Sequence, residues 1–439
     1  MFLQRCKLKF GLVLLVCALI CSSSTGSSSS ILEKHPEIKE GLEMGDRILD
    51  AIDSKEFLEV VPFLAEWSMP FLKALELMIQ IIQDKENVEG WQQVRDLLTR
   101  YNERLRQMSE EYTDVRHAID WNTVKVSFGA YERSIIALKQ NMENALNAPV
   151  GPVREQQQNY FVKMFEHDYN NAANKIYNSM VTEHMIFSEN MIAVARRYTR
   201  DHRRLLHSFM LGVYKLIMEG VELEITYLIF NDQAGSISFI KKQWDENYKT
   251  LQAKYDVVDK EISANWYRQA GLDMDHYASM NPDLGRSEYA TYLYGKLQDK
   301  FYWRSWMVIV YEPVSGFNSH AMSDCNQTLL RYRQVGRNVA VESVDRGMSQ
   351  FQGLEAATQI GQLTTKFPAF QKDKPLYLIN QLMSNTGFES CYSSKYRFAF
   401  VNTANTHTEI RADPKHFVHK VKSVKAIINY YNFNVVLFG

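Results

Sequence analysis

The chain has 439 residues, with 50 Lys and Arg against 51 Asp and Glu, so its formal net charge is −1 at pH 7. This balance excludes a general electrostatic affinity for nucleic acid, and we expect no nucleic-acid partner. The length allows two or three domains. The small numbers of proline (10) and glycine (20) favour a largely helical protein.

The N-terminal segment has the pattern of a secretory signal peptide. Arg5, Lys7 and Lys9 precede an apolar run over residues 10–20, and small residues follow it. We expect residues 1–26 to form a signal peptide that is cleaved near its end, so the mature protein would be secreted and extracellular. An uncleaved membrane anchor is the alternative, although the apolar run is short for a bilayer span.

Two helical segments are predicted after a serine-rich linker. Residues 31–53 alternate apolar and charged side chains at helical spacing, which predicts an amphipathic helix. Residues 57–82 are more apolar and contain Pro62 and Pro70, each of which should kink or restart a helix. We interpret this second segment as buried helix, with a membrane-active segment as the alternative.

Longer helices are predicted in the next part of the chain. Residues 91–119 and 121–146 each show the charged, amphipathic pattern of a long helix. The sequence PVGP at 149–152 should end the second of them. Residues 155–198 then carry an aromatic and methionine stripe, which predicts one further long helix with a core-facing side.

The most apolar helical stretch covers residues 208–230, and its small and polar side chains step by four and three residues into one narrow stripe. The stripe consists of Ser208, Gly212, Lys215, Glu219, Glu222 and Thr226. Because apolar side chains cover the other sides, we expect this helix at the centre of a bundle. A membrane span is the alternative, but each charge near the middle opposes insertion by about 2.5–3.5 kcal/mol. A final long helix is predicted over residues 237–267.

The character of the chain changes at residues 271–285, which we interpret as a linker. Asp273, Asp275 and Asp283 lie there, but their spacing lacks the glycine and third ligand of a helix–loop–helix calcium site. Short runs rich in β-branched and aromatic residues follow and predict strands. They are residues 306–311, 338–344, 395–401 and 434–438.

Helices are predicted between these strands, over residues 322–334 and 414–430, with residues 354–384 inserted between the two halves. Two strand–helix–strand units of this kind suggest a ferredoxin-like arrangement. The expected fold class is therefore α+β. It combines a helical bundle over residues 31–270 with a small α/β domain over residues 284–439.

Two cysteines, Cys325 and Cys391, remain after the predicted signal peptide. In an oxidising compartment they would form one disulfide within the C-terminal region, and two free thiols are the alternative. Asn326 begins an Asn-Gln-Thr sequon, which predicts a glycosylation site on an exposed segment.

The sequence shows no G-x-S-x-G nucleophile motif and no phosphate-binding glycine loop, so we expect no catalytic residues and no cofactor. His416 and His419 have the spacing of a metal-ligand pair, but no third ligand lies nearby in the sequence, and two surface histidines are the simpler interpretation. His320 and His407 each follow a predicted strand and could meet at one edge of the sheet.

One local basic cluster precedes the central helix, and a second lies between residues 415 and 425. The first could receive an acidic partner or anionic lipid head groups, although a solvated helix end is the simpler interpretation. It consists of Arg196, Arg197, Arg200, Arg203 and Arg204.

Several short patterns together resemble the rapunzel and cephalotoxin-like family, over roughly residues 57–344. They are Ile119-Asp120-Trp121, Tyr131-Glu132, the block HSFMLGVYKLIMEGVELE at 207–224, Gln243-Trp244, Trp303, Trp306, Val310-Tyr311 and Val314-Ser315-Gly316. The family comprises secreted or cytosolic animal proteins, and a match to the cephalotoxin that gives it its name would imply a secreted venom or salivary component. The resemblance carries no catalytic residues over to this chain.

With this resemblance, we expect the protein to act by binding a protein receptor or a membrane surface. Only two cysteines follow the predicted signal peptide, whereas the cephalotoxin that gives the family its name is expected to have cysteine-rich modules. An extracellular structural or developmental factor without toxicity is therefore the alternative. A third possibility is an enzyme that uses the C-terminal α/β domain. The sequence does not indicate the oligomeric state.

Overall fold

The computed structural model describes residues 122–439 apart from seven gaps and, nearer the N-terminus, isolated residues between 33 and 103. The gaps are 184–188, 315–319, 325–327, 348–352, 369–371, 387–395 and 427–428. The chain divides into two compact units, Met1–Ile262 and Ser263–Gly439, which we call the helical unit and the C-terminal unit. The predicted signal peptide lies outside the described residues.

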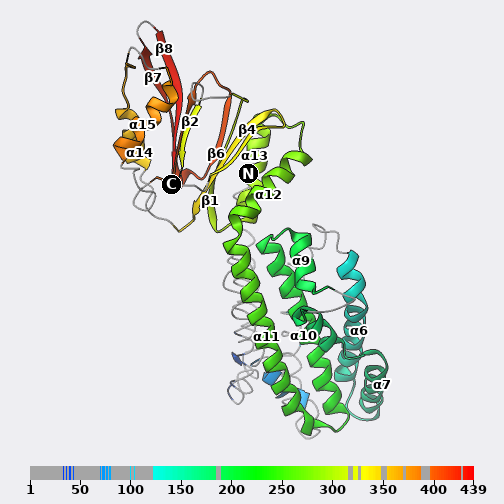
Figure 1. Cartoon of the computed structure of the whole chain (residues 1–439). Coiled ribbons are helices and arrows are strands. Elements are labelled where there is room, and N and C mark those ends of the chain that lie inside the picture. Colours follow the sequence, from blue (N-terminus) through cyan, green and yellow to red (C-terminus); the bar gives the residue numbers. More distant parts are fainter. Residues whose placement is uncertain are drawn as a thin grey trace. The chain divides into compact units, whose positions relative to one another are not determined.

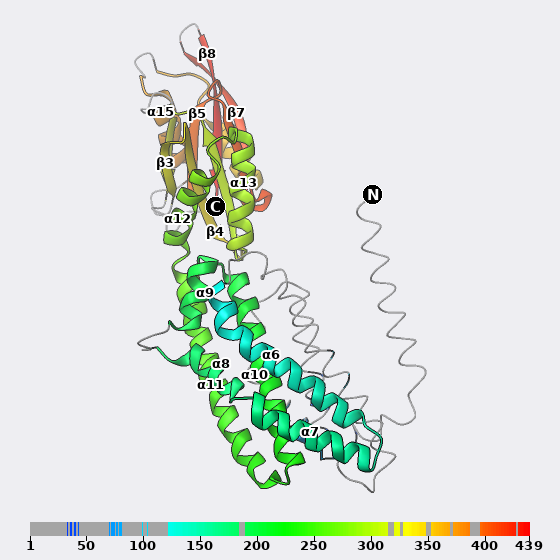
Figure 2. The same ribbon diagram turned by 90° about the vertical axis from the view of Figure 1, so that its right-hand side faces the viewer.

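The helical unit is built from long helices (Figure 1). Those described in full are α6 (Asn122–Asn147), α7 (Pro152–Asp168), α8 (Ala172–Val181), α9 (Met191–Thr199), α10 (Arg203–Phe230) and α11 (Ile237–Ala264). Helices α6 and α7 lie side by side as a hairpin (Figure 2), and the predicted break at residues 149–152 is its turn.

Helix α10 is the centre of the helical unit, as predicted. Twenty of its 28 residues are buried, and it packs against α6, α7, α8 and α9. Complete burial of a large apolar side chain contributes about 1.5–3 kcal/mol, so this helix carries much of the unit's core. Among the helices that the structure describes, none combines the length and apolarity needed to cross a membrane.

Helix α11 presents the predicted aromatic face to α10. Trp244, Tyr248 and Tyr255 are almost completely buried. The Tyr214 ring of α10 stacks on Tyr248 with 5.3 Å between centroids, and its hydroxyl donates to the Tyr248 carbonyl at 3.2 Å. These contacts fix how α11 lies against the central helix.

The single helix predicted over residues 155–198 is divided in the structure into α7, α8 and α9, so this prediction was wrong. Asn170 and Asn171 adopt left-handed backbone conformations, with φ of 45° and 57°, and they end α7 before α8 begins. Asparagine tolerates this conformation better than most residues, because its short polar side chain can bond locally. The hydrophobic period continues across the break and conceals it in the sequence.

The C-terminal unit contains two antiparallel four-stranded sheets (Figure 1). The strands are β1 (Arg304–Tyr311), β2 (His320–Asp324), β3 (Leu329–Gln334), β4 (Arg337–Asp345), β5 (Phe398–Thr403), β6 (Thr408–Ala412), β7 (Phe417–Ala426) and β8 (Asn429–Phe438). One sheet has the order β3-β4-β1-β6, and the other has the order β2-β5-β8-β7.

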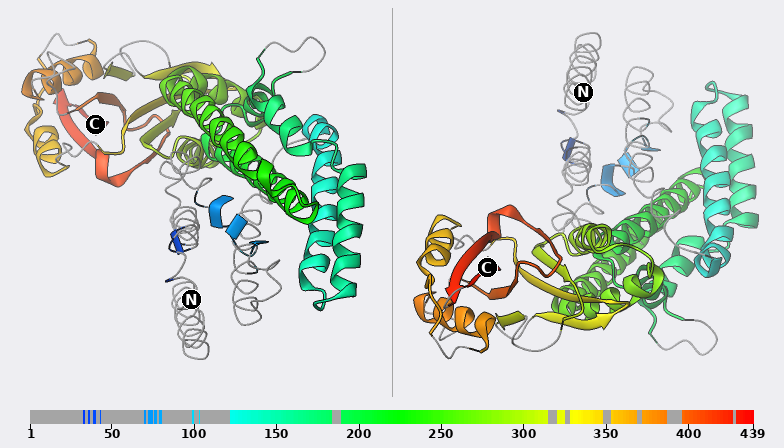
Figure 3. Two further views of the ribbon diagram at one scale, coloured as in Figure 1. Left: turned by 90° about the horizontal axis from the view of Figure 1, so that it is seen from below. Right: turned by 90° about the horizontal axis from the view of Figure 1, so that it is seen from above.

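Helices cover the outer face of each sheet, so the C-terminal unit has four layers. Helices α12 (Trp266–Met280) and α13 (Arg286–Lys300) share a core with β1 and β4. Helices α14 (Gly353–Gln362) and α15 (Lys374–Thr386) share another with β5 and β8, beside which they lie in Figure 3. A third core lies between the sheets. It contains Met307, Ile309, Tyr311, Ala340, Val344, Phe398, Phe400, Val436 and Phe438.

The α+β class is confirmed, and the four predicted strands correspond to β1, β4, β5 and β8. The ferredoxin-like arrangement predicted for the C-terminal unit was wrong. In the described parts of residues 322–334 and 414–430, strands β2, β3, β7 and the start of β8 stand where helices were predicted, and only Pro414–His416 forms a short 3₁₀ helix. Val418, Val421 and Val424 recur every three residues and imitate a helical period. Their β-branched side chains favour the strand that they form.

The stretch at residues 271–285 is not a linker, since most of it belongs to helix α12. Gly271 misled the prediction. It is buried inside the helix, and a Cβ atom there would lie 3.5 Å from Leu329 and Arg331 side-chain atoms. These are ordinary van der Waals distances, so the glycine is simply packed inside the helix and does not mark a break in the chain.

Candidate functional site: buried charges and a groove in the helical unit

The first polar cluster of the helical unit lies where α6 crosses α10. Lys139 of α6 donates to Glu219 at 2.9 Å, and its ammonium nitrogen lies 3.6 Å from a carboxylate oxygen of Glu222. Lys215, one turn before Glu219, approaches the same carboxylate at 3.6 Å. The stripe predicted from the sequence therefore meets a cation from another helix inside the core.

Burial makes this cluster sensitive to protonation. The Glu222 side chain is completely buried, which raises the pKa of its carboxyl to about 7 even though Lys139 opposes the shift. Burial by itself would lower the pKa of Lys139, but the carboxylates of Glu222 and Glu219 outweigh it, and the net shift is upward. The ammonium group is thus held in its charged form between two carboxylates.

The second cluster joins the C-terminal end of α7 to α10 and α11 around Glu224. The Tyr169 hydroxyl donates to this carboxylate at 2.7 Å, and the Trp244 indole N–H donates to its other oxygen at 2.8 Å. Burial raises the pKa of Glu224, and the two hydrogen bonds oppose the rise. Gly220 makes the contact possible, because a Cβ atom there would lie 2.7 Å from the Cβ of Ala173.

The third cluster lies near the start of α10 and centres on Asp259 of α11. Arg203 and His207 both contact this carboxylate, His207 through Nε2 at 2.6 Å. Burial would raise the pKa of Asp259, but the hydrogen bonds from His207 and Arg203 outweigh it and hold the pKa below its usual value. All three clusters use their charges to join helices.

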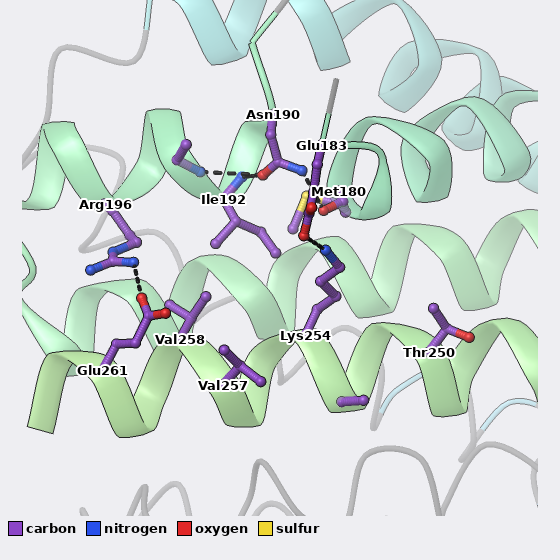
Figure 4. Close-up of a pocket in the computed structure, with 12 residues that line it drawn as sticks. Met180, Glu183, Asn190, Ile192, Arg196, Thr250, Lys254, Val257, Val258 and Glu261 are labelled. Atoms are coloured by element: carbon purple, nitrogen blue, oxygen red, sulfur yellow. Dashed lines mark hydrogen bonds and ion pairs between the residues drawn. The ribbon is translucent and has the colours of Figure 1, made fainter. Parts of the chain in front are cut away.

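A groove of about 580 Å³ lies between α11 and residues at the end of α8 and the start of α9 (Figure 4). We call it the α9–α11 groove. It is lined by Met180, Glu183, Asn190, Ile192, Ala193, Arg196, Thr250, Ala253, Lys254, Val257, Val258 and Glu261. Its volume is in the range of small-molecule sites.

One wall of the groove is fixed by Asn190. Its side-chain oxygen accepts from the backbone N–H groups of Ile192 and Ala193, at 2.9 and 3.3 Å, and so caps α9. Its amide nitrogen donates to the carbonyls of Met180 and Thr182, at 2.7 and 3.0 Å. Asn190 therefore ties the start of α9 to the end of α8.

Residues 84–283 match the family model of the cephalotoxin-like middle helical domain. The chain contains a cephalotoxin-like middle helical domain. The match confirms the family resemblance predicted from the sequence, and at the level of the family it indicates a toxin-like protein, which suggests secretion. The three polar clusters and the α9–α11 groove all lie within this domain. No curated protein and no solved structure matches the chain.

The basic cluster predicted from the sequence lies in the cephalotoxin-like domain, where acidic residues of the same domain bind Arg196, Arg197 and Arg203. Arg196 binds Asp201 at 2.8 Å and Glu261 at 2.6 Å, while Arg197 binds Glu189 at 2.8 Å. The third is Arg203, in the Asp259 cluster described above. Arg200 ends α9 in a left-handed conformation with φ of 53°. An anionic partner for the cluster stays a prediction.

The remaining predicted sites lie outside the cephalotoxin-like domain. Cys325, Cys391 and Asn326 are not among the described residues, so the disulfide and the glycosylation site stay predictions. His416 and His419 each contact an oxygen within the C-terminal unit, at 3.2 and 3.1 Å. Among the described residues, no group of three or more His, Cys, Asp and Glu side chains could hold a metal ion.

His320 and His407 contact different groups. The buried His320 ring lies 5.5 Å from the Tyr311 ring and 5.9 Å from the Tyr332 ring, and burial lowers its pKa. The exposed His407 imidazole lies 3.3 Å from Glu409.

Two of the aspartates in the rejected calcium pattern are ion-paired within the C-terminal unit. Asp273 binds Lys300, and Asp275 binds Arg331 at 2.7 Å.

Sequence reasoning found the acidic stripe of the cephalotoxin-like domain but missed its partners. Lys139 lies 80 residues before Glu219, and Asp259 lies 56 residues after Arg203. The α9–α11 groove was missed entirely. Its Lys254–Glu183 pair joins positions 71 residues apart, and no sequence motif marks either residue.

Proposed function

We propose that this is a secreted, non-enzymatic, toxin-like protein that acts by binding the membrane surface of a target cell. The cephalotoxin-like domain supports the toxin-like class. The observation that carries membrane binding is the turn between α6 and α7. We call it the hairpin tip and define it as Pro149, Val150, Pro152 and Val153.

The hairpin tip is exposed and apolar. Val150 and Val153 are 63% and 52% exposed, and both prolines are exposed as well. Arg154 is the one charged residue between positions 147 and 154, and it is buried. An apolar turn whose nearest exposed charge is Glu155, in the first turn of α7, suits contact with the boundary between lipid head groups and acyl chains.

The hairpin tip is also held in shape. Arg154 donates from Nε and Nη2 to the carbonyl oxygen of Ala148, at 3.0 and 2.9 Å, and so clamps the two ends of the turn together. A rigid tip loses little conformational entropy on binding. Inserting it contributes on the order of 2 kcal/mol, which orients the protein at a membrane but needs further contacts to hold it there.

Sedimentation with lipid vesicles tests the proposal. The full-length protein is mixed with phosphatidylcholine vesicles, with and without phosphatidylserine. The variant V150D/V153D should bind at least tenfold more weakly than the wild type. The control is I136D, because Ile136 is similarly exposed, at 56%, on the same hairpin but about 18 Å from Ala148.

Leakage and cell-binding assays define the outcome further. Release of a trapped dye, or lysis of erythrocytes, by the wild type would extend binding to membrane permeabilisation. Binding to cells but to no vesicle would identify a protein receptor in place of lipid. Failure to bind either cells or vesicles would overturn the proposal, as would equal binding by V150D/V153D and I136D.

A further inference from the structure

The α9–α11 groove has an apolar floor between two charged ends (Figure 4). At one end Lys254 of α11 pairs with Glu183, and at the other Arg196 of α9 pairs with Glu261 at 2.6 Å. The apolar side chains between them are Met180, Ile192, Val257 and Val258. An apolar channel with a cation at its end has the chemistry of a site for an amphiphile.

The dimensions suit a short chain. Lys254 and Glu261 are seven residues apart on α11, which corresponds to a rise of about 10.5 Å along two helical turns. Val257 and Val258 lie on the same face between them. A ligand along this face would thus pass over valine side chains before it reached the second ion pair.

The two ends differ in how readily they release a carboxylate. Arg196 is held by two partners, since Asp201 binds it at 2.8 Å in addition to Glu261. Lys254 pairs with Glu183, whose side chain is 63% exposed. An exposed ion pair contributes little to stability, so a ligand anion could replace the Glu183 carboxylate with no change in local charge.

We propose that the α9–α11 groove binds a single-chain amphiphile with an anionic head group, the head group on Lys254 and the alkyl chain along Val257 and Val258. A free fatty acid and a lysophospholipid share this chemistry. The inference concerns a site inside the cephalotoxin-like domain and does not depend on membrane binding by the hairpin tip.

Titration calorimetry on the full-length protein, without vesicles and below the micelle concentration of each compound, tests the class of ligand. Affinity should rise roughly fourfold for each methylene added from hexanoate to octanoate, and it should level off once the chain exceeds the groove. Decyltrimethylammonium has a similar chain with the opposite charge, and it should bind at least tenfold more weakly than decanoate. Lysophosphatidylglycerol is the second arm and identifies the preferred head group.

Two variants locate the ligand. K254E should weaken decanoate binding at least tenfold, whereas K249E should not, because Lys249 lies on the same helix in an exposed pair with Asp245 and does not line the groove. V257D introduces a charge on the chain's path at a half-exposed position, so it should weaken binding in a folded protein. Circular dichroism confirms that each variant is folded.

Three results would overturn the inference. They are the absence of decanoate binding by the wild type, an affinity independent of chain length, and equal losses in K254E and K249E. The calorimetry contains no membrane, so the absence of ligand binding in the groove would not affect the proposal of membrane binding, which the V150D/V153D variant tests separately.

Discussion

The two units of this protein bury charge in different ways. In the helical unit, three carboxylates on one helix, Glu219, Glu222 and Glu224, share two nearby lysines and two neutral donors. In the C-terminal unit, the buried Asp273 is matched by the buried Lys300. The comparison teaches that a core can hold polar groups with or without an excess of one charge. An excess of buried carboxylate, as at Glu222, makes stability depend on pH near neutrality.

The C-terminal unit also contains a buried chain of uncharged hydrogen bonds. Asn434 of β8 donates to Asn402 of β5 at 3.0 Å, and Asn402 donates to Thr408 of β6 at 2.7 Å. His419 of β7 contacts the Asn434 side chain at 3.1 Å. This chain links strands of the two sheets, and its amide groups carry no charge that titrates.

The largest expected effect comes from removing the shared lysine. K139M leaves Glu219 and Glu222 buried without their main cation, and it should destabilise the helical unit by about 3–5 kcal/mol at pH 8. K300M should destabilise the C-terminal unit by a similar amount, because it removes the buried cation that binds the Asp273 carboxylate. Hydrogen exchange read by mass spectrometry assigns each loss to its unit.

The pH dependence of these losses sharpens the comparison. The K139M loss should shrink at pH 5, where a protonated Glu222 no longer needs a cation. K249M removes an exposed ion pair and should change stability by less than about 0.5 kcal/mol. A K139M protein as stable as K249M would show that the cluster is not the charged core described above.

The second prediction concerns the pH profile of the helical unit. The pKa of Glu222 is raised from 4.5 to about 7, so the folded unit holds this proton more tightly than the unfolded chain does. The stabilisation of the folded unit by this proton is therefore complete below pH 4.5 and is lost as the pH rises through 7. It amounts to about 3 kcal/mol.

Comparison with E222Q isolates this contribution, because the amide cannot ionise while the other titrating groups are kept. The wild-type helical unit should lose about 2.5 kcal/mol more than E222Q between pH 5 and pH 8, measured by hydrogen exchange at both values. The C-terminal unit provides the internal control, since E222Q should leave its profile unchanged. Parallel profiles for the two proteins in the helical unit would contradict an excess of buried carboxylate.

The parts of the fold that the sequence predicted depend on strong local periodicity. The helix over residues 208–230 and the aromatic face of residues 237–267 were found, because their apolar side chains recur at the helical period for many turns. The strand at residues 306–311 was found, because five of its six residues are β-branched or aromatic. Each of these signals lies within a single element.

The errors have equally specific causes. The break at Asn170 and Asn171 was missed within the helix predicted over residues 155–198. The left-handed backbone conformation of these two residues cannot be recognised from the side-chain pattern. The β3–β4 turn places Val335 at φ of 46°, where a β-branched residue is rarely found, so Gly336, at φ of 74°, was the one turn signal of this two-residue hairpin loop. In the buried ion pairs of the helical unit, the sequence pattern identified the residue on α10. Its partner on α6 or α11 lies more than 50 residues away in the sequence, at separations of 80 and 56 residues.

The smallest expected effect compares two glycines, one in each unit. Gly220 lies where α8 crosses α10, and a Cβ atom there would meet Ala173 at 2.7 Å, whereas a Cβ on Gly295 of α13 would meet no atom within 4 Å. G220A should destabilise the helical unit by about 1–3 kcal/mol through overpacking. G295A should stabilise the C-terminal unit by about 0.5–1 kcal/mol, because alanine restricts the unfolded chain and favours helix.

Both glycines lie inside helices, so helix propensity alone would make both alanine variants more stable. A loss of stability in G220A together with a gain in G295A would therefore show the effect of the close contact between α8 and α10. The G220A protein should also show faster exchange at α8, since separating the helices weakens the Tyr169–Glu224 bond. If G220A were as stable as the wild type, α8 would be free to move outward. The tight crossing at Gly220 would then be dispensable, and the hydroxyl of Tyr169 would not depend on it to reach the carboxylate of Glu224.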